Sequence, residues 1–308
     1  MKTDWLRCAP EVADALADGC PVVALESTIV AHGMPYPQNL TTAQAVEDLI
    51  RSHGAVPATI AVMDGAIRVG LSAAELEQLA QAGAQALKLS RRDIAYAVAQ
   101  RRLGATTVAA TMLCAQAAGI RVFVTGGIGG VHRGAQQSMD ISADLMELAR
   151  TPVAVVCAGA KSILDLPLTL EVLETQGVPV VAVGQEGFPA FYSRESGLKA
   201  DFRIDEPAAL AAFLRCHWGL GLSSGVVVAN PVPAAHEIPA AQVEVWIAQA
   251  LREADEQGIH GKASTPFMLK RLAELSQGRS LATNIELVKH NAVLGARLAA
   301  NLARLPKA

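Results

Sequence analysis

A lysine and a glutamate of this sequence have surroundings that suit covalent and acid–base chemistry. Lys161 follows the apolar run 153–158, so we expect its amine at the partly buried end of a strand. Burial favours a neutral amine, which can attack a carbonyl carbon and form a Schiff base. Glu26 ends the apolar run 22–25, where a carboxyl group must be paired or protonated, as suits a general acid. The simpler alternatives are a solvent-facing lysine beside a helix capped by Ser162, and a glutamate that caps backbone amides.

A glycine-rich loop, residues 125–134, begins with Thr125 and contains His132. Several glycines allow the backbone to approach a ligand closely. The loop does not fit GxGxxG, and segments 159–162 and 261–265 lack the upstream glycine of a Walker A loop, so NAD and ATP lose support. His132 is a candidate for substrate contact, with simple exposure as the alternative.

Acidic residues gather around the expected start of a helix near Ile141. Asp140 and Asp144 are four residues apart and would share a helix face, with Ser142 between them. So few protein ligands would favour Mg²⁺ or Mn²⁺ with several waters over zinc. Helix capping by Asp140 or Ser142 is the alternative.

A basic turn offers a possible phosphate site. Lys88, Ser90 and the pair 91–92 precede Thr107 and Val108, whose helix N-terminal amides would suit a phosphate. An ordinary solvated basic turn is the alternative.

The elements that must position these residues alternate between short apolar runs and helical stretches. We expect strands at 22–27, 59–64, 66–71, 121–127, 152–160, 178–184 and 225–233. We expect helices from about 41 to 54, from 72 to 83, at 106–119, at 141–150, before 177, from 207, and through most of the last seventy residues. Residues 185–203 lack a clear period and are expected to form a loop or lid.

This alternation predicts an α/β protein, a three-layer α/β/α fold with a central, largely parallel mixed sheet. The Asp64–Gly65 turn adds an antiparallel hairpin. No composition break marks a linker, so we expect one domain over residues 1–308. Because ligands of open α/β sheets bind at the carboxyl ends of strands, Glu26, the His132 loop, Lys161 and Asn230 should converge on one edge.

Composition excludes several partners. The formal net charge of −3 implies no basic face, so nucleic acid is not expected as a partner. The five cysteines are scattered without a CxxC pair, which favours reduced thiols in a cytoplasmic protein over disulfides. Neither a signal peptide nor an apolar run long enough for a membrane span is present. We therefore expect a soluble protein that binds a small molecule.

Several long motifs, in matching order from about residue 8 to 303, resemble the pseudouridine-5′-phosphate glycosidase family, also called indigoidine-synthase-A-like. They are VVALESTIVAHGMPYPQN (22–39), GAVPATIAVMDG (54–65), KLSRRD (88–93), GATTVAATM (104–112), VTGGIGGVHRGA (124–135), DISADL (140–145), VVCAGAKSILDL (155–166), FPAFY (188–192), VVVANPVP (226–233), GKASTPFML (261–269) and SLATNIELVKHNA (280–292). The segment 185–187 departs from the family pattern, which affects only the expected lid.

The resemblance implies residue roles that spacing alone does not give. Lys161 would be the nucleophile and Glu26 the proton donor, with Asp140 holding one Mn²⁺ per subunit. The implied substrate-binding residues are Lys88, Thr107, Val108, Thr125, His132, Ser142, Ala143, Asp144 and Asn284. The resemblance also implies a homotrimer, and we expect no sugar-kinase region of the kind that some relatives carry.

The implied reaction is reversible cleavage of the C–C glycosidic bond of pseudouridine 5′-phosphate, through a Schiff base between Lys161 and ring-opened ribose. A C-glycoside has no heteroatom leaving group, so a two-carboxylate glycosidase mechanism fits poorly. The alternatives are a Schiff-base aldolase or lyase for another sugar phosphate, C-glycoside chemistry on another base, and a sugar-phosphate-binding protein without activity. Because Lys161 and Glu26 are both present, the binding protein is the least favoured.

Overall fold

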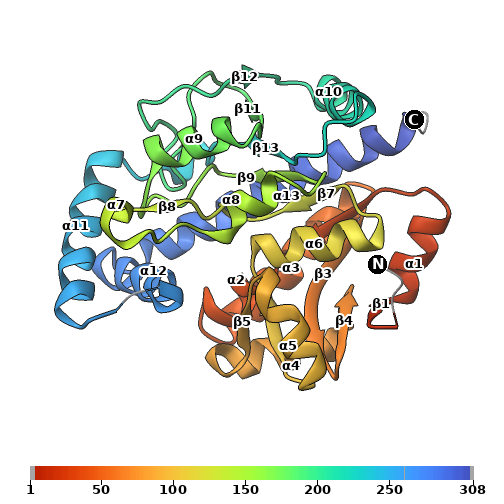
Figure 1. Ribbon diagram of the computed structural model, residues 1–308, viewed down its shortest axis with the longest axis horizontal. Helices are drawn as coiled ribbons and strands as arrows, with labels where there is room; N and C mark the ends of the chain where they lie inside the picture. Colours follow the sequence, from red (N-terminus) through yellow and green to blue (C-terminus); the bar gives the residue numbers. More distant parts are fainter. Residues whose placement is uncertain (1–3, 260, 306–308) are drawn as a thin grey trace.

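The computed structural model describes residues 4–259 and 261–305, and its centre is one large sheet between layers of helices (Figure 1). Along the sheet the strands are β1 (Leu6–Cys8), β4 (Ala66–Val69), β3 (Val56–Met63), β2 (Val22–Leu25), β7 (Val122–Val124), β9 (Ala154–Cys157), β13 (Val226–Ala229), β11 (Val180–Ala182) and β12 (Phe202–Arg203). Strand β6 (Gly104–Thr106) pairs with β3, and β5 (Leu87–Leu89) pairs with β6. A separate pair joins β8 (Val131–His132) and β10 (Leu164–Asp165).

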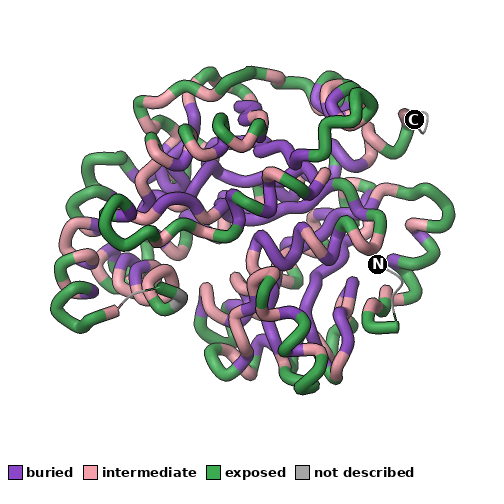
Figure 2. The backbone as a smooth tube through the Cα atoms, viewed as in Figure 1, coloured by how far each residue is buried: buried purple, intermediate pink, exposed green. Residues whose placement is uncertain are grey.

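The sheet is mixed but mostly parallel, which confirms the predicted fold class. Only the β3–β4 and β3–β6 pairings within the large sheet are antiparallel among the residues described. Every residue of β2, β7, β9 and β13 is buried, as expected for parallel strands that helices cover on both faces (Figure 2). The assignment of residues 1–308 to a single domain stays a prediction.

Helices cover both faces of the sheet. They are α1 (Pro10–Ala17), α2 (Thr28–His32), α3 (Gln38–Ser52), α4 (Ala73–Ala82), α5 (Ile94–Ala99), α6 (Val108–Ala118), α7 (Ala135–Ser138), α8 (Ala143–Leu148), α9 (Leu166–Thr175), α10 (Pro207–Gly219), α11 (Ala240–Glu256), α12 (Ser264–Leu275) and α13 (Arg279–Arg304). The long helix α13 packs with α3 and α10 behind the strands, while α6 and α8 pack together in front (Figure 1). No helix within the described part of the chain is long and apolar enough to cross a membrane.

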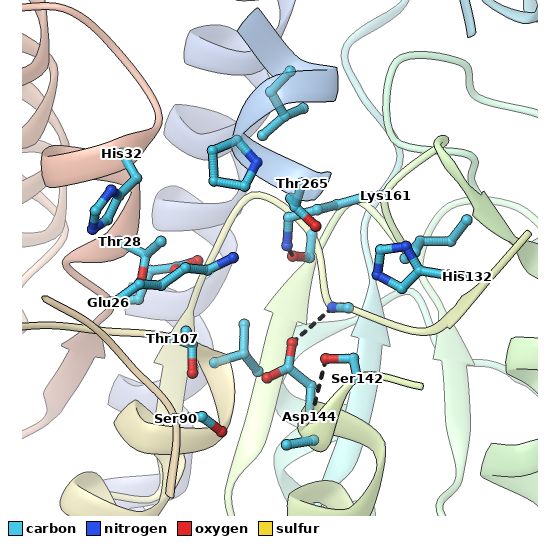
Figure 3. A pocket seen from close by; sticks show the side chains of 18 of the residues that line it. Glu26, Thr28, His32, Ser90, Thr107, His132, Ser142, Asp144, Lys161 and Thr265 are labelled. Carbon is cyan, nitrogen blue, oxygen red and sulfur yellow. Dashed lines mark hydrogen bonds between the residues drawn. The ribbon is translucent and has the colours of Figure 1, made fainter. Parts of the chain in front are cut away.

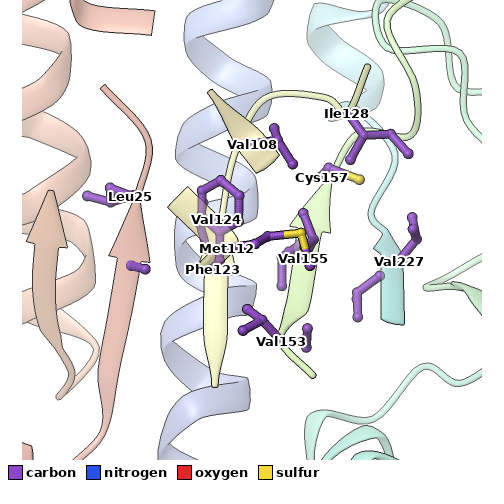
Figure 4. Close-up of a cluster of buried hydrophobic side chains, with 14 of the residues drawn as sticks. Leu25, Val108, Met112, Phe123, Val124, Ile128, Val153, Val155, Cys157 and Val227 are labelled. Carbon is purple, nitrogen blue, oxygen red and sulfur yellow. The ribbon is translucent and has the colours of Figure 1, made fainter. Parts of the chain in front are cut away.

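The central core joins the two faces through apolar side chains of the middle strands (Figure 4). Phe123 of β7, Val155 of β9 and Met112 of α6 are fully buried there. In α13, a Cβ atom at Gly295 would lie 2.2 Å from Val124 Cγ2, so glycine lets this helix lie directly against the sheet. The strands are therefore held in a fixed register, and so are the side chains that follow them.

Register places the carboxyl ends of the central strands at one edge. Leu25 pairs with Val124, Val124 with Val156, and Cys157 with Ala229. Glu26, Thr125 and Asn230 therefore leave the sheet at neighbouring points, as the sequence predicts.

Local signals in the sequence are confirmed at three boundaries. Asp64 and Gly65 both have positive φ (53° and 78°), as the two-residue turn between β3 and β4 requires. Ser72 and Glu75 form the predicted capping box of α4. Gly119 ends α6 in the left-handed conformation.

Other predicted boundaries are wrong. Helix α3 begins at Gln38, so Thr41 lies inside the helix and its hydroxyl donates to Pro37 O instead of capping. Thr106 belongs to β6, and Thr107 is the cap of α6. Helix α9 begins at Leu166 with Asp165 as its cap, so Ser162 caps no helix there.

Residues 185–201 form the predicted irregular loop, whereas 202–203 form strand β12 and the middle of the loop is part of the core. Phe188, Phe191 and Tyr192 are buried, and Phe191 N donates to Ala158 O at 3.0 Å. The aromatic residues hold this segment beneath the end of β9, so the alternative of a free lid is wrong for them.

Candidate active site

A cavity of about 510 Å³ opens at the carboxyl edge of the sheet (Figure 3). All of the predicted site residues except Thr125 line it, namely Glu26, Lys88, Thr107, Val108, His132, Asp140, Ser142, Ala143, Asp144, Lys161 and Asn284. The cavity thus brings together residues that follow β2 and β9, residues of β5 and α13, and the loop that follows β7. The roles of these residues stay predictions.

Glu26 leaves β2 and places its carboxyl group at the cavity wall. Thr125 Oγ1 donates a hydrogen bond to Glu26 Oε1. Burial raises the pKa of Glu26 above its ordinary value, and the charge of Lys161 and the Thr125 hydrogen bond offset part of this rise. A carboxyl group that holds its proton to higher pH is suited to act as an acid.

Thr125 lies behind Glu26 and does not line the main cavity, contrary to its predicted contact with substrate. It borders a small neighbouring cavity of about 30 Å³. Its backbone carbonyl accepts a hydrogen bond from Asn291 Nδ2 at 2.9 Å, and Asn291 Oδ1 accepts one from Asn230 Nδ2 at 3.0 Å. Asn230 therefore supports the site from within the protein, and a buried polar chain from α13 holds Thr125 and, through it, Glu26.

Lys161 follows β9 and directs its amine into the cavity, where Nζ donates to the carbonyl oxygen of Gly127. Its backbone amide donates to Ile128 O at 3.1 Å, which fixes the lysine against the glycine-rich loop. Gly159, with φ of 80°, makes the turn before it, and a Cβ atom there would lie 2.2 Å from Pro189 O. The alternative of a lysine that points to solvent is wrong.

Asp144 acts as a clamp between two backbone segments. Its Oδ1 accepts from Ala109 N and its Oδ2 from Gly129 N, both at 2.8 Å. Ser142 caps α8 by accepting from Asp144 N at 3.2 Å (Figure 3). A Cβ atom at Gly129 would lie 2.3 Å from Ser142 Oγ, so only glycine fits at this point of the loop.

His132 lies across the cavity from Glu26 (Figure 3), and Asp140 lies beside His132. The His132 Nδ1–Asp140 Oδ2 distance is 3.9 Å. Burial lowers the pKa of His132, while the carboxylate of Asp140 opposes the shift. The imidazole is thus mainly neutral near pH 7 and can accept as well as donate a hydrogen bond.

The surroundings of Asp140 restrict the kind of metal that could bind. No group of three or more His, Cys, Asp or Glu side chains within 4–259 and 261–305 could hold a metal ion. The carboxylate of Asp140 is partly exposed and lies beside the imidazole of His132, and the backbone amide of Asp140 donates to the hydroxyl of Ser138. This set of groups fits Mg²⁺ or Mn²⁺ that keeps most of its waters. It does not fit a closed zinc site with four protein ligands.

The far end of the cavity is cationic. Ser90, Arg91 and Thr107 line it from the turn after β5 and the start of α6, and Arg150 lines it from beyond α8. Lys88 of β5 also lines the cavity, and its charge acts on Glu26 and His132 as well. The amide of Thr107 donates to Leu89 O at 2.9 Å, which brings these segments together. This clustering favours an anionic ligand group over the alternative of a solvated turn.

Sequence reasoning missed two groups of residues. Asn291 supports the site from α13, and its spacing of seven residues from Asn284 places both on one helix face, a signal that was present. Thr265, Pro266 and Leu269 of α12 line the cavity wall, and no residue type among them suggests chemistry.

Comparison with known proteins places the chain among close relatives. The family model described as indigoidine synthase A like protein matches residues 11–301. A pseudouridine-5′-phosphate glycosidase of Cupriavidus pinatubonensis is 61% identical over 99% of this chain and 98% of its own. Another from Paracoccus denitrificans is 63% identical over 97% and 98%, respectively.

Two solved structures are similar throughout. The prealnumycin C-glycosynthase AlnA, in complex with ribulose 5-phosphate, has a TM-score of 0.90 and 39% identity, covering 97% of both chains. An indigoidine synthase A-like protein from Thermotoga maritima has a TM-score of 0.89 and 35% identity, also covering 97% of both.

Proposed function

Because the chain belongs to the indigoidine synthase A-like family, we propose that this enzyme is a pseudouridine-5′-phosphate glycosidase. It would cleave the C–C glycosidic bond of pseudouridine 5′-phosphate reversibly, giving uracil and ribose 5-phosphate. One observation carries the chemical part of the proposal: the amine of Lys161 and the carboxyl group of Glu26 line one cavity, close enough for their charges to interact.

The first step opens the ribose ring. Once deprotonated, the amine of Lys161 attacks C1′, the C1′–O4′ bond breaks, and Glu26 gives its proton to O4′. The carboxylate of Glu26 then takes a proton from the new C1′-ammonium group, which leaves a neutral amine on the open-chain sugar.

The second step breaks the C–C bond. The lone pair of the amine forms a double bond with C1′, the bond from C1′ to C5 of uracil breaks, and Glu26 delivers its proton to C5. Water then hydrolyses the iminium ion, which releases ribose 5-phosphate and restores Lys161. The electron pair therefore leaves with the base only after nitrogen has replaced the ring oxygen.

The cationic end of the cavity would anchor the 5′-phosphate through Lys88 and the amide of Val108. Binding energy at this remote group would orient C1′ against Lys161. At the other side, His132 and Asn284 would contact the base or sugar, and Ser142, Ala143 and Asp144 would complete the wall.

Asp140 would hold Mn²⁺, which when bound would add positive charge beside the anionic substrate. The proposal also includes a homotrimer, a cytoplasmic location and a role in pseudouridine degradation. The metal requirement can be tested by removing divalent metal with a chelator and restoring it with Mn²⁺ or Mg²⁺ while uracil release is followed.

Trapping the covalent intermediate tests the mechanism. Borohydride added during turnover should reduce the imine and leave a ribose-phosphate adduct on Lys161, which peptide mass spectrometry would locate. Lys161→Ala protein serves as the matched control and should carry no adduct. Unlabelled wild-type protein that still releases uracil would exclude the Schiff base.

A second candidate function is synthesis of a C-glycoside on another base. The similarity to a C-glycosynthase with ribulose 5-phosphate bound favours it. The higher identity to proteins named as glycosidases favours cleavage. Comparing uracil with other acceptors in the reverse reaction, at a fixed concentration of ribose 5-phosphate, separates the two.

A further inference from the structure

Arg91, at the cationic end of the cavity, is held by a carboxylate that the mechanism above does not use. Its Nε and Nη2 donate to the two oxygens of Glu147, with an Nη2–Oε1 distance of 2.6 Å. Glu147 is completely buried in α8, whereas 37% of the Arg91 side chain is exposed. One half of this ion pair therefore lies inside the protein and the other half at the cavity wall.

Glu147 is fixed from more than one side. Thr151 Oγ1 also donates to its Oε1, and Arg150 Nη2 lies 3.4 Å from its Oε2. A carboxylate with this many partners cannot rotate, so it fixes the plane of the guanidinium group that it binds. Two arginines share its single negative charge, and both of them line the cavity.

The guanidinium group has donors to spare. Arginine carries five N–H groups, and the bidentate contact with Glu147 uses two of them. Arg91 lines the cavity together with Ser90 and Thr107, which lie at the end below Glu26 in Figure 3. An anionic group bound there would meet two hydroxyl groups and the remaining edge of a fixed arginine.

We propose that Arg91 binds the substrate phosphate and that Glu147 is the residue that positions it. The inference rests on the proposed function, because it names a further residue for the 5′-phosphate. The planar fork of arginine matches a phosphate geometrically, so fixing its orientation in advance reduces the entropy lost on binding. The competing interpretation is a purely structural ion pair that joins the turn after β5 to α8.

The neighbouring arginine provides a matched control. Arg92 has the same charge, lies next in the chain and also lines the cavity, but 78% of its side chain is exposed and its Nε lies 3.8 Å from Asp93 Oδ1, so among the residues described no buried carboxylate fixes it. If the phosphate is attracted only by the general positive potential, the two arginines should contribute equally to substrate affinity. If the phosphate is bound by a fixed arginine, Arg91 should contribute much more to this affinity.

Uracil release from pseudouridine 5′-phosphate and from unphosphorylated pseudouridine tests the proposal. For Arg91→Gln, KM for the phosphorylated substrate should rise about 10- to 100-fold, the usual scale for a lost charge-assisted hydrogen bond, with little change in kcat. Arg92→Gln should change KM by less than about fivefold. For pseudouridine, kcat/KM should be the same in both variants. Equal losses for both substrates, or for both arginines, would overturn the proposal.

Changes at Glu147 test positioning separately. Glu147→Gln should raise KM about tenfold for the phosphorylated substrate alone, and the double variant with Arg91→Gln should be no worse than Arg91→Gln, as for residues that act as a unit. Additive losses would contradict the positioning role. Because Glu147 is buried, Arg91→Lys provides a second route: it keeps the charge but loses the fork, and full affinity in this variant would also contradict it.

Failure of the proposed function is distinguishable from failure of this inference. Wild-type protein that releases no uracil from either substrate would refute the function alone. Calorimetric titration with ribose 5-phosphate then decides the phosphate site, since Arg91→Gln should weaken binding about 10- to 100-fold relative to wild type. Equal binding by the two proteins, or none by wild type, would overturn the site.

Discussion

The two ends of the cavity hold their functional groups in different ways. At the end with Glu26 and Lys161, the hydrogen-bond partners are neutral, namely the hydroxyl of Thr125 and the carbonyl of Gly127, although the charges of Lys161 and Lys88 also act on Glu26. At the cationic end, Arg91 is paired with the full charge of Glu147. A neutral partner fixes the position of a functional group but leaves its pKa sensitive to burial. A charged partner fixes the position of the group and also stabilises its charged form. Groups that exchange protons should thus depend on neutral contacts, and groups that only bind should depend on ion pairs.

Removing the lysine amine is the strongest test of this comparison. Lys161→Ala should lower kcat on the order of 10⁴-fold or more, because no other group replaces a lost nucleophile. Binding of ribose 5-phosphate, measured by calorimetry, should be weakened far less, because the cationic end is unchanged. Substantial turnover by this variant would mean that the chemistry occurs elsewhere.

The next effect concerns the acid. Glu26→Gln should lower kcat by about 100-fold or more, the scale of a lost general acid. A change confined to KM would instead give Glu26 a binding role.

The pH dependence of the wild-type enzyme should report the same carboxyl group. Burial raises the pKa of Glu26 above 4.5, so a step that needs the acid should slow as the pH rises through that higher value. Between these two values the folded protein binds more protons than the unfolded chain, so its stability should also fall as the pH rises. Both trends should weaken in Glu26→Gln, as measured by rate profiles and by urea unfolding at several pH values.

Thr125→Val should sharpen the comparison, because it removes a neutral contact while keeping the shape of the side chain. We expect about a tenfold loss of kcat, the scale of one hydrogen bond. The hydroxyl of Thr125 lowers the pKa of Glu26, so its loss should raise that pKa further and move the alkaline limb of the rate profile to higher pH. A shift to lower pH would contradict the assigned contact.

The last prediction concerns stability rather than chemistry, at the Asp144 clamp. Asp144→Asn leaves one backbone N–H group facing an amide that cannot accept, which should reduce the free energy of unfolding by about 1–3 kcal/mol. Urea denaturation measures this loss, with Asp140→Asn as a comparison on the same loop. Equal stability of Asp144→Asn and wild type would indicate that the carboxylate contributes little to holding the loop.

Much of the fold follows from local sequence patterns. Continuous apolar runs predict the buried parallel strands, and the Asp64–Gly65 turn and the Ser72 capping box predict their own boundaries. The short strands β1, β5, β6, β8, β10 and β12 were missed, because two or three residues carry no recognisable period. Their pairing depends on tertiary contacts that sequence patterns do not record.

The candidate site was predictable where a residue follows a strand. Glu26 and Lys161 illustrate this, since the edge of a parallel sheet collects such residues. Thr125 shows the limit of this prediction. Packing decides whether a side chain at that edge faces the ligand or a neighbouring side chain, and the sequence does not record that packing. Asn291 and Glu147 were not recognised, because each acts only through a residue distant in sequence.

The polar chain behind Glu26 also bears on how the molecule assembles. Glu26 and Thr125 are 99 residues apart, and Thr125 and Asn291 are separated by 166. Contacts between such distant residues form only after large loops have closed, which makes them slow and late during folding. A nascent chain on the ribosome would therefore build most of the sheet before Glu26 is held in place, and the cavity would be complete only when α13 docks.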